Sequence, residues 1–252
     1  MVTTSRWLEA APLVIAHRGA SLVTPENTLA AFRQALRLGA EAVELDAKLT
    51  RDGEVVCFHD RTLERTTGAR GRPGDLTLAE LRSLDAGRWK GDAFAGEKIP
   101  TLDEVLESMR GRALVNVELT DYWADQPMLA ARTVAAVRRH AAERDVLFSS
   151  FQTGALTAVE RIAPEIPRAH LNGPTWLAYR DRFVLRRADV QALHLHESLV
   201  RPERVDSVHR SGRRLHVYTV DAPETMARLW AEGVDGLITD APDEALRTRK
   251  AA

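Results

Sequence analysis

Three carboxylates occupy alternating positions within apolar runs of the sequence. Glu44 and Asp46 lie two residues apart in segment 42–49, and Glu118 lies in segment 114–120. Since successive side chains of a strand point to opposite faces, Glu44 and Asp46 share one face, and Glu118 joins them if its polar face points inward. Carboxylates gathered in an apolar sheet repel one another unless protons or a cation neutralise them. The spacing predicts an oxygen-ligand site for a divalent cation, Mg²⁺ or Ca²⁺.

Two histidines end apolar runs in the same manner. His17 is followed by Arg18 and a glycine, and His59 is followed by Asp60. A polar surface turn or a loop hydrogen bond would also explain each histidine taken alone. Cleavage of a phosphodiester needs a base, an acid and positive charge beside the phosphorus-bound oxygens. Two imidazoles and an arginine around a carboxylate-held cation would supply all of these.

The elements that must position these groups alternate between strands and helices. The expected main strands are segments 13–18, 42–49, 114–120, 146–151, 168–171, 192–196, 215–220 and 236–240, with a further apolar run at 55–59. Eight strands in about 250 residues indicate an α/β TIM (β/α)8 barrel, whose active site forms at the carboxyl ends of the strands. A doubly wound parallel sheet is the competing architecture.

Local signals predict two further features. A first helix is expected over 25–38, with Thr24 as its cap and Gly39 at its end. The glycine-rich segment 60–100 interrupts the alternation and is interpreted as a cap-like insertion after the second strand. It is expected to lie beside the barrel mouth within one domain that spans residues 1–252.

Composition limits the partners of the chain. The 252 residues carry 35 basic and 36 acidic side chains, so the near-zero net charge argues against nucleic acid as a ligand. The single cysteine, Cys57, excludes a disulfide scaffold and a multi-cysteine zinc site, and it is expected to be a buried strand thiol. No apolar run is long enough for a signal peptide or a membrane span. We expect a cytoplasmic protein that acts on a small molecule; a homo-oligomer is left open.

Ordered motifs over more than 200 residues resemble the glycerophosphodiester phosphodiesterases. The motifs that carry the resemblance are His17-Arg18-Gly19-Ala20, Pro25-Glu26-Asn27-Thr28, Glu44-Leu45-Asp46, Phe58-His59-Asp60, Asn116-Val117-Glu118 and the segment 233–242. The resemblance implies a barrel with an insertion after the second strand. It also implies hydrolysis of a glycerophosphodiester to sn-glycerol 3-phosphate and an alcohol, in lipid and glycerol metabolism, with a bound divalent cation.

The resemblance also implies a role for individual residues. Carried over by position, Glu44, Asp46 and Glu118 would ligate the metal, and His17 and His59 would form the acid–base pair. Arg18 would hold the phosphate, and Glu26 would belong with it to the inner shell of the substrate- and phosphate-binding site. For Glu26 the alternative is a first-turn acid that complements a helix dipole.

The sequence departs from the family pattern at three positions. Thr120 stands where the family usually has a lysine, so this position cannot supply a cation to the phosphate. Tyr218 stands where a tryptophan is frequent, and Asp221 replaces the usual asparagine. The first departure concerns phosphate affinity, and the other two concern substrate preference.

Two rival functions fit the same residues. A lyase that stops at a cyclic phosphate would use the same groups, and the sequence does not choose between water and a substrate hydroxyl as nucleophile. A relative that binds without turnover would explain the missing lysine, although the retained histidines and carboxylates argue against it. Outside this set, His194 and His196 share a strand face, for which a structural role is expected, and Trp176 and Tyr179 fall in a segment that could line the mouth.

Overall fold

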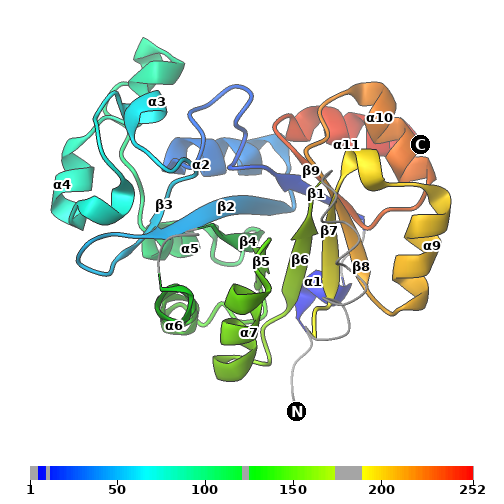
Figure 1. Ribbon diagram of the computed structural model, residues 1–252. Coiled ribbons are helices and arrows are strands. Elements are labelled where there is room, and N and C mark those ends of the chain that lie inside the picture. Colours follow the sequence, from blue (N-terminus) through cyan, green and yellow to red (C-terminus); the bar gives the residue numbers. More distant parts are fainter. Residues whose placement is uncertain (1–4, 10–11, 121–124, 174–188, 252) are drawn as a thin grey trace.

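A closed barrel of eight parallel strands forms the centre of the computed structural model (Figure 1). The structure describes residues 5–9, 12–120, 125–173 and 189–251. Around the barrel the strands follow the order β1, β2, β4, β5, β6, β7, β8 and β9, and β9 pairs with β1 to close the circle. This closure confirms the predicted (β/α)8 barrel and excludes the doubly wound sheet.

Each expected strand is present, with ends that differ by a few residues. The strands are β1 (Leu13–Ala16), β2 (Ala42–Leu49), β3 (Val55–Cys57), β4 (Leu114–Leu119), β5 (Val146–Ser150), β6 (Arg168–Asn172), β7 (Ala192–His196), β8 (Arg214–Tyr218) and β9 (Gly236–Thr239). Only β3 lies outside the parallel barrel, because it pairs with β2 in the antiparallel sense.

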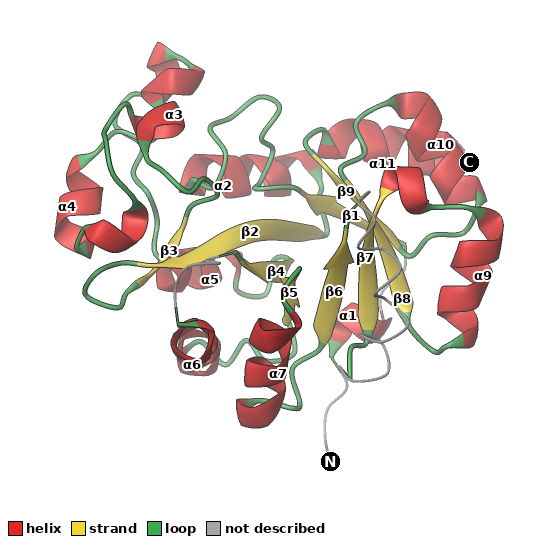
Figure 2. Ribbon diagram, viewed as in Figure 1, coloured by secondary structure: helices red, strands yellow, loops and turns green. Residues whose placement is uncertain are grey.

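Helices follow the strands and cover the outside of the barrel (Figure 2). The described α-helices are α1 (Arg6–Glu9), α2 (Leu29–Leu38), α3 (Glu64–Thr67), α4 (Leu78–Ser83), α5 (Leu102–Met109), α6 (Gln126–Arg139), α7 (Thr153–Ile162), α9 (Pro202–Arg210), α10 (Pro223–Ala231) and α11 (Pro242–Ala251). Within this part of the chain, no helix has the length and apolar character needed to cross a membrane.

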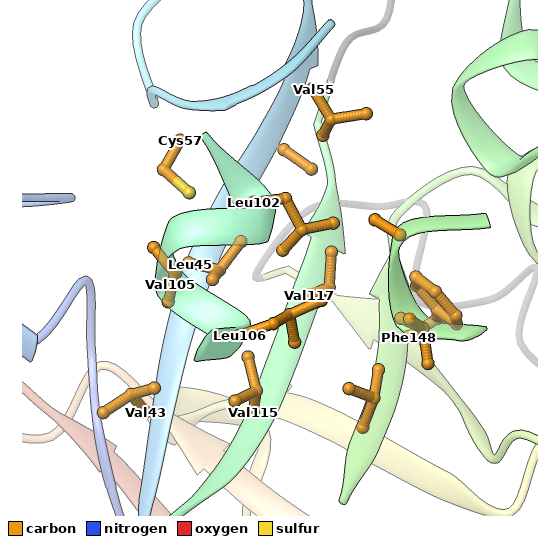
Figure 3. Close-up of a cluster of buried hydrophobic side chains, with 14 of the residues drawn as sticks. Val43, Leu45, Val55, Cys57, Leu102, Val105, Leu106, Val115, Val117 and Phe148 are labelled. Atoms are coloured by element: carbon orange, nitrogen blue, oxygen red, sulfur yellow. The ribbon is translucent and has the colours of Figure 1, made fainter. Parts of the chain in front are cut away.

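The alternation along the strands separates a core from a functional face. On β2, Val43 and Leu45 point outward and pack against Val105 and Leu106 of α5 (Figure 3). Buried apolar area of this kind stabilises a fold by roughly 25 cal/mol per Å² removed from water. The alternate residues of β2 therefore point into the barrel, among them Glu44.

Apolar side chains close the amino-terminal end of the barrel. Trp7 of α1 is fully buried. It belongs to one cluster with Leu13, Leu114 and Leu147, which lie at the starts of β1, β4 and β5. Its indole donates a hydrogen bond to the carbonyl oxygen of Asp145, at 2.9 Å. Since this end is filled, the polar ends of the strands at the opposite end are left to form a site.

The first helix begins later than the sequence predicts. Helix α2 starts at Leu29, and its cap is Thr28, whose hydroxyl accepts a hydrogen bond from Ala31 N; Thr24 instead donates to the carbonyl of Ala20. The expected start at residue 25 was wrong because Asn27 adopts a left-handed backbone with φ 56°, which a helix cannot include. Gly39 ends the helix, as predicted, with φ 94°.

The segment between β3 and α5 folds into short helices beside the strand β3 (Figure 2). Capping boxes start α4 and α5, formed by Thr77 with Glu80 and by Thr101 with Glu104. A small cluster that includes Leu63 holds the segment against the barrel. The cysteine of β3 is buried, as expected.

Candidate active site

Three carboxylates meet inside the mouth of the barrel. Glu44 and Asp46 come from β2 and Glu118 from β4, and the parallel register sets Asp46 directly beside Glu118. One oxygen of each residue lies within 4.8 Å of the others. The structure therefore brings together the three residues that the sequence predicts as a metal site.

Burial and mutual repulsion raise the pKa of two of these carboxyls. Burial, and next the charge of Asp46, raise the pKa of Glu118 to about 8. The same two causes, with Glu118 added, raise the pKa of Glu44 well above its usual range. Burial also opposes ionisation of Asp46, but nearby Arg18 and His59 outweigh it and lower the pKa of that carboxyl. The three buried carboxyls therefore favour a positive charge between them.

An unsatisfied oxygen shows that the cluster fits a cation. Within the described chain, Oε1 of Glu44 and Oδ1 of Asn116 are buried without a hydrogen-bond partner. A buried carboxylate oxygen without a donor is costly, and a hard cation satisfies it. The donor set, made only of oxygens, suits Mg²⁺ or Ca²⁺ rather than zinc.

His17 is held by an aspartate from the other end of the chain. Its Nδ1 lies 2.6 Å from Oδ1 of Asp240, and the hydroxyl of Ser21 donates to the same oxygen at 2.8 Å. Since an ionised carboxylate only accepts, the proton of this contact belongs to Nδ1. His17 therefore keeps Nε2 for proton transfer.

His59 has an equivalent partner next to it in the sequence. Its Nδ1 lies 2.8 Å from Oδ1 of Asp60, which also accepts from Arg65. The guanidinium of Arg65 reaches on to both carboxylate oxygens of Glu26, at 2.7 Å each. Glu26, His59 and Asp60 form a second group with metal-like spacing. Because Arg65 already supplies their counter-charge, these three residues do not need a metal.

Arg18 links this network to the carboxylates. It donates to Oε1 of Glu26 at 2.9 Å, and its Nε lies 3.2 Å from Oδ2 of Asp46. Its backbone N–H donates to Oε2 of Glu44 at 3.0 Å, and its backbone is left-handed, with φ 54°. At Gly19 a Cβ atom would lie 2.6 Å from the backbone of Ala31, so only glycine fits. The turn after β1 is thus built to aim Arg18 inward.

Asn27 explains why α2 starts late. Its Nδ2 donates to Oδ2 of Asp46 at 2.8 Å, and its Oδ1 accepts from the backbone N–H of Asp46 at 3.2 Å. Asparagine tolerates the left-handed conformation that this clamp needs. The same turn places Glu26 beside Arg18 instead of in the first turn of a helix, so the helix-dipole interpretation of Glu26 was wrong.

The candidate site residues line a pocket and a groove. A pocket of about 140 Å³ is lined by His17, Arg18, Glu44 and Glu118. A larger groove of about 820 Å³ runs past His59 and is lined on its other side by residues that include Lys48, Arg61 and Thr120. We call these the carboxylate pocket and the His59 groove. Together they offer separate room for two halves of a substrate.

Sequence reasoning missed residues that reach the site from distant segments. Asp240, Asn27 and Arg65 each hold a predicted site residue. The motif positions contained these residues, but nothing in their spacing assigned the contacts. His194 lies at the floor of the carboxylate pocket and contacts His216 at 3.0 Å. Trp176 and Tyr179 lie outside the described residues.

Two of the residues that differ from the family pattern have clear positions. Tyr218 lines the carboxylate pocket, and burial, followed by the charge of Glu118, raises the pKa of its hydroxyl. Oδ1 of Asp221 accepts from Thr239 and from the backbone of Asp240, both at 2.9 Å. Tyr218 can therefore touch a ligand, whereas Asp221 supports the aspartate that holds His17.

Comparisons with known proteins agree with this geometry. The model of the glycerophosphoryl diester phosphodiesterase family matches residues 17–244. A glycerophosphodiester phosphodiesterase of Caldanaerobacter subterraneus subsp. tengcongensis is 40% identical over 237 residues, which cover 92% of this chain and 95% of that protein.

Solved structures give the same result. An Oleispira antarctica phosphodiesterase, solved in complex with the product sn-glycerol-3-phosphate, has a TM-score of 0.87 at 33% identity and covers 95% of this chain and 97% of its own. The glycerophosphodiester phosphodiesterase of Agrobacterium tumefaciens has a TM-score of 0.81 at 30% identity, with 97% and 100% covered. With its barrel, its carboxylate centre and this similarity over nearly its whole length, the chain belongs to the glycerophosphoryl diester phosphodiesterase family.

Proposed function

We propose that the protein hydrolyses glycerophosphodiesters to sn-glycerol 3-phosphate and an alcohol, with a divalent cation and the pair His17 and His59. The observation that carries this proposal is the arrangement of two aspartate-held imidazoles around a centre of three carboxylates. Such a set provides positive charge, an acid and a base within one barrel mouth, as phosphodiester cleavage requires.

Glu44, Asp46 and Glu118 would hold the cation, either Mg²⁺ or Ca²⁺. The short distances between their oxygens and the unpartnered Oε1 of Glu44 support this role. A bound cation supplies positive charge that offsets the phosphodiester's negative charge and the charge that develops on its oxygens during cleavage. Glu44 and Glu118 would release their protons to solvent when the cation binds, because metal ligands must be ionised.

The two histidines would divide the proton transfers. One imidazole, neutral before reaction, takes a proton from the attacking oxygen through Nε2. The other, charged before reaction, gives a proton to the leaving alkoxide. The contacts of His17 with Asp240 and of His59 with Asp60 would fix the orientation and the tautomer of each ring. Loss of either imidazole should reduce the rate by about 10²–10⁴-fold.

Arg18 would bind the phosphate, and Glu26 would act by holding Arg18. A guanidinium has five N–H donors, so its contacts with Glu26 and Asp46 leave donors for a phosphate oxygen. The carboxylate pocket suits the glycerol phosphate half of the substrate in size, and the His59 groove gives room for the alcohol.

Further expectations of the sequence belong to this proposal. We propose that residues 1–252 form one domain with residues 60–100 as a cap-like insertion, and that the activity serves lipid and glycerol metabolism. Cytoplasmic location, homo-oligomerisation and the lack of nucleic-acid binding stay predictions of the sequence.

Phosphorus NMR of the products tests the activity. Chelated protein is given Mg²⁺ or Ca²⁺ and one of four substrates: glycerophosphocholine, glycerophosphoethanolamine, glycerophosphoinositol or a lysophospholipid. Glycerol 3-phosphate, formed only with metal, is the expected product of the three glycerophosphodiesters, and lysophosphatidate is the corresponding product of the lysophospholipid. Accumulation of a cyclic phosphate would instead identify a lyase, and binding without product in any arm would identify a non-catalytic relative.

A further inference from the structure

Lys48 of β2 lies next to Thr120, which follows β4 and stands where the family usually has a lysine. Lys48 follows Glu44 and Asp46 at two-residue intervals, so its side chain points into the barrel on the same face. It is 7% exposed, and of the four lysines in the sequence it is the only buried one. A buried ammonium group brings a full positive charge into the barrel mouth, beside the three carboxylates.

The strand register brings Lys48 to Thr120. Asp46 pairs with Glu118 and Ala47 with Leu119, so one more step sets Lys48 beside Thr120, just above the carboxylates. The Nζ atom lies 3.4 Å from the carbonyl oxygen of Thr120 and 3.5 Å from its hydroxyl oxygen. The ammonium of Lys48 thus lies against Thr120, the residue at which the family usually has a lysine.

The charges around the carboxylates are arranged on two sides. Arg18 approaches from β1, which pairs with one edge of β2, and Lys48 reaches toward β4 at the other edge. The positive charge of Lys48 is close enough to oppose the rise in the pKa of Glu118. Lys48 also lines the groove that contains His59. An anion bound over the carboxylates would therefore lie between Arg18 and Lys48.

We propose that Lys48 is a phosphate-binding residue that supplies, from β2, the cation that position 120 on β4 does not provide. This inference rests on the proposed phosphodiesterase function and extends it to a residue of this chain. An ammonium group is a hydrogen-bond donor with a full positive charge, and such groups bind phosphate oxygens. Thr120 then acts as a support that holds the ammonium, and the same charge reaches the substrate from the adjacent strand.

The test moves the ammonium between the two strands. Lys48→Met removes the charge but keeps an unbranched chain, and the double variant Lys48→Met/Thr120→Lys restores it from β4. Lys250→Met, at an exposed position on α11, is the matched control for loss of one lysine. For each variant we would measure kcat/KM for glycerophosphocholine with saturating metal, and the Kd of sn-glycerol 3-phosphate by calorimetry.

Lys48→Met should lower kcat/KM and weaken product binding by about 10–100-fold, the range for a lost hydrogen bond to a charged group. The double variant should recover most of both losses, and Lys250→Met should match the wild type. Unchanged kcat/KM and Kd in Lys48→Met would overturn the proposal. So would a folded double variant that recovers neither quantity, since a packing role is not restored from another strand.

Melting curves of the variants and hydrolysis by the wild type serve as controls for the test of Lys48. Melting curves show whether each variant is folded, and Lys48→Gln replaces Lys48→Met if the methionine variant melts too low to assay. Hydrolysis by the wild type is measured first. If the wild type does not hydrolyse the substrate, the proposed function fails, and the Kd of glycerol 3-phosphate alone then decides on Lys48.

Discussion

His17 and Asp240 face each other at the ends of the neighbouring strands β1 and β9, with Nδ1 of the imidazole 2.6 Å from the carboxylate oxygen. The contact joins residues 223 positions apart in the sequence. It fixes the tautomer in which Nε2 is available to a substrate. Asp240 is thus a positioning residue for the proposed acid–base pair.

Replacing Asp240 by asparagine should reduce kcat by at least about 10²-fold, because an amide does not stabilise the charged ring and can favour the wrong tautomer. Steady-state kinetics of the folded variant measure this loss. Asp243→Asn, on the exposed start of α11, is the control; equal kcat in the two variants would contradict the role of Asp240.

The sequence was sufficient to locate the carboxylate centre but not its supports. Period-two alternation placed Glu44 and Asp46 on one face of β2, and the parallel order of strands brought Glu118 beside them. Such patterns are local, so they are visible in the residues themselves. The pairing of Asp240 with His17 depends on closure of the barrel between β9 and β1, which no local pattern encodes.

The start of α2 also shows the difference between what a local sequence pattern predicts and what a tertiary contact decides. The residues Thr24 and Pro25 are a good local signal for a helix start, and the signal failed because Asn27 is bound to Asp46 through two hydrogen bonds. A tertiary contact thus overrode a local preference, at a place where the backbone serves the site. The link between Lys48 and Thr120 was hidden for a related reason, since it needs the register of two strands.

Binding of the cation should release protons near neutral pH. Burial and the charge of Asp46 raise the pKa of Glu118 to about 8, and an ionised ligand is needed for the metal. Metal affinity should therefore increase with pH as Glu118 ionises around pH 8, and the ionisation of Glu44, whose pKa is also raised, adds to the increase. Titration calorimetry in buffers of different protonation enthalpy measures the protons released. An affinity that does not change between about pH 6 and about pH 9 would show that Glu118 is not a ligand.

Glu118→Gln should have opposite effects on stability and on metal binding. In the metal-free wild type, the pKa of Glu118 lies above its ordinary 4.5, so the folded state binds the extra proton. The stabilising contribution of this group is complete below pH 4.5 and is lost as pH rises to about 8. Metal-free Glu118→Gln should therefore melt above the wild type in alkaline buffer.

Addition of Mg²⁺ or Ca²⁺ should raise the melting temperature of the wild type but not that of Glu118→Gln. Differential scanning calorimetry measures both effects, and Glu107→Gln, exposed on α5, is the control. An equal metal-induced rise in wild type and Glu118→Gln would exclude Glu118 from the metal site.

The clamp between Asn27 and Asp46 should stabilise the fold as well as the site. Asn27→Gly keeps access to the left-handed backbone and should lose about 1.5–3 kcal/mol, the value of hydrogen bonds to a charged group. Asn27→Ala adds about 1 kcal/mol of backbone strain. Denaturant unfolding monitors the two variants. If alanine and glycine were equally stable, the left-handed conformation of residue 27 would be contradicted.

The most direct test of the account is the rate at which His17→Ala and His59→Ala hydrolyse glycerophosphocholine with saturating metal, compared with the wild type by phosphorus NMR. Each imidazole is held by its own aspartate beside the carboxylate centre. Each variant should therefore form glycerol 3-phosphate about 10²–10⁴-fold more slowly while remaining folded and still binding metal. Near-native turnover in either variant would contradict the acid–base pair.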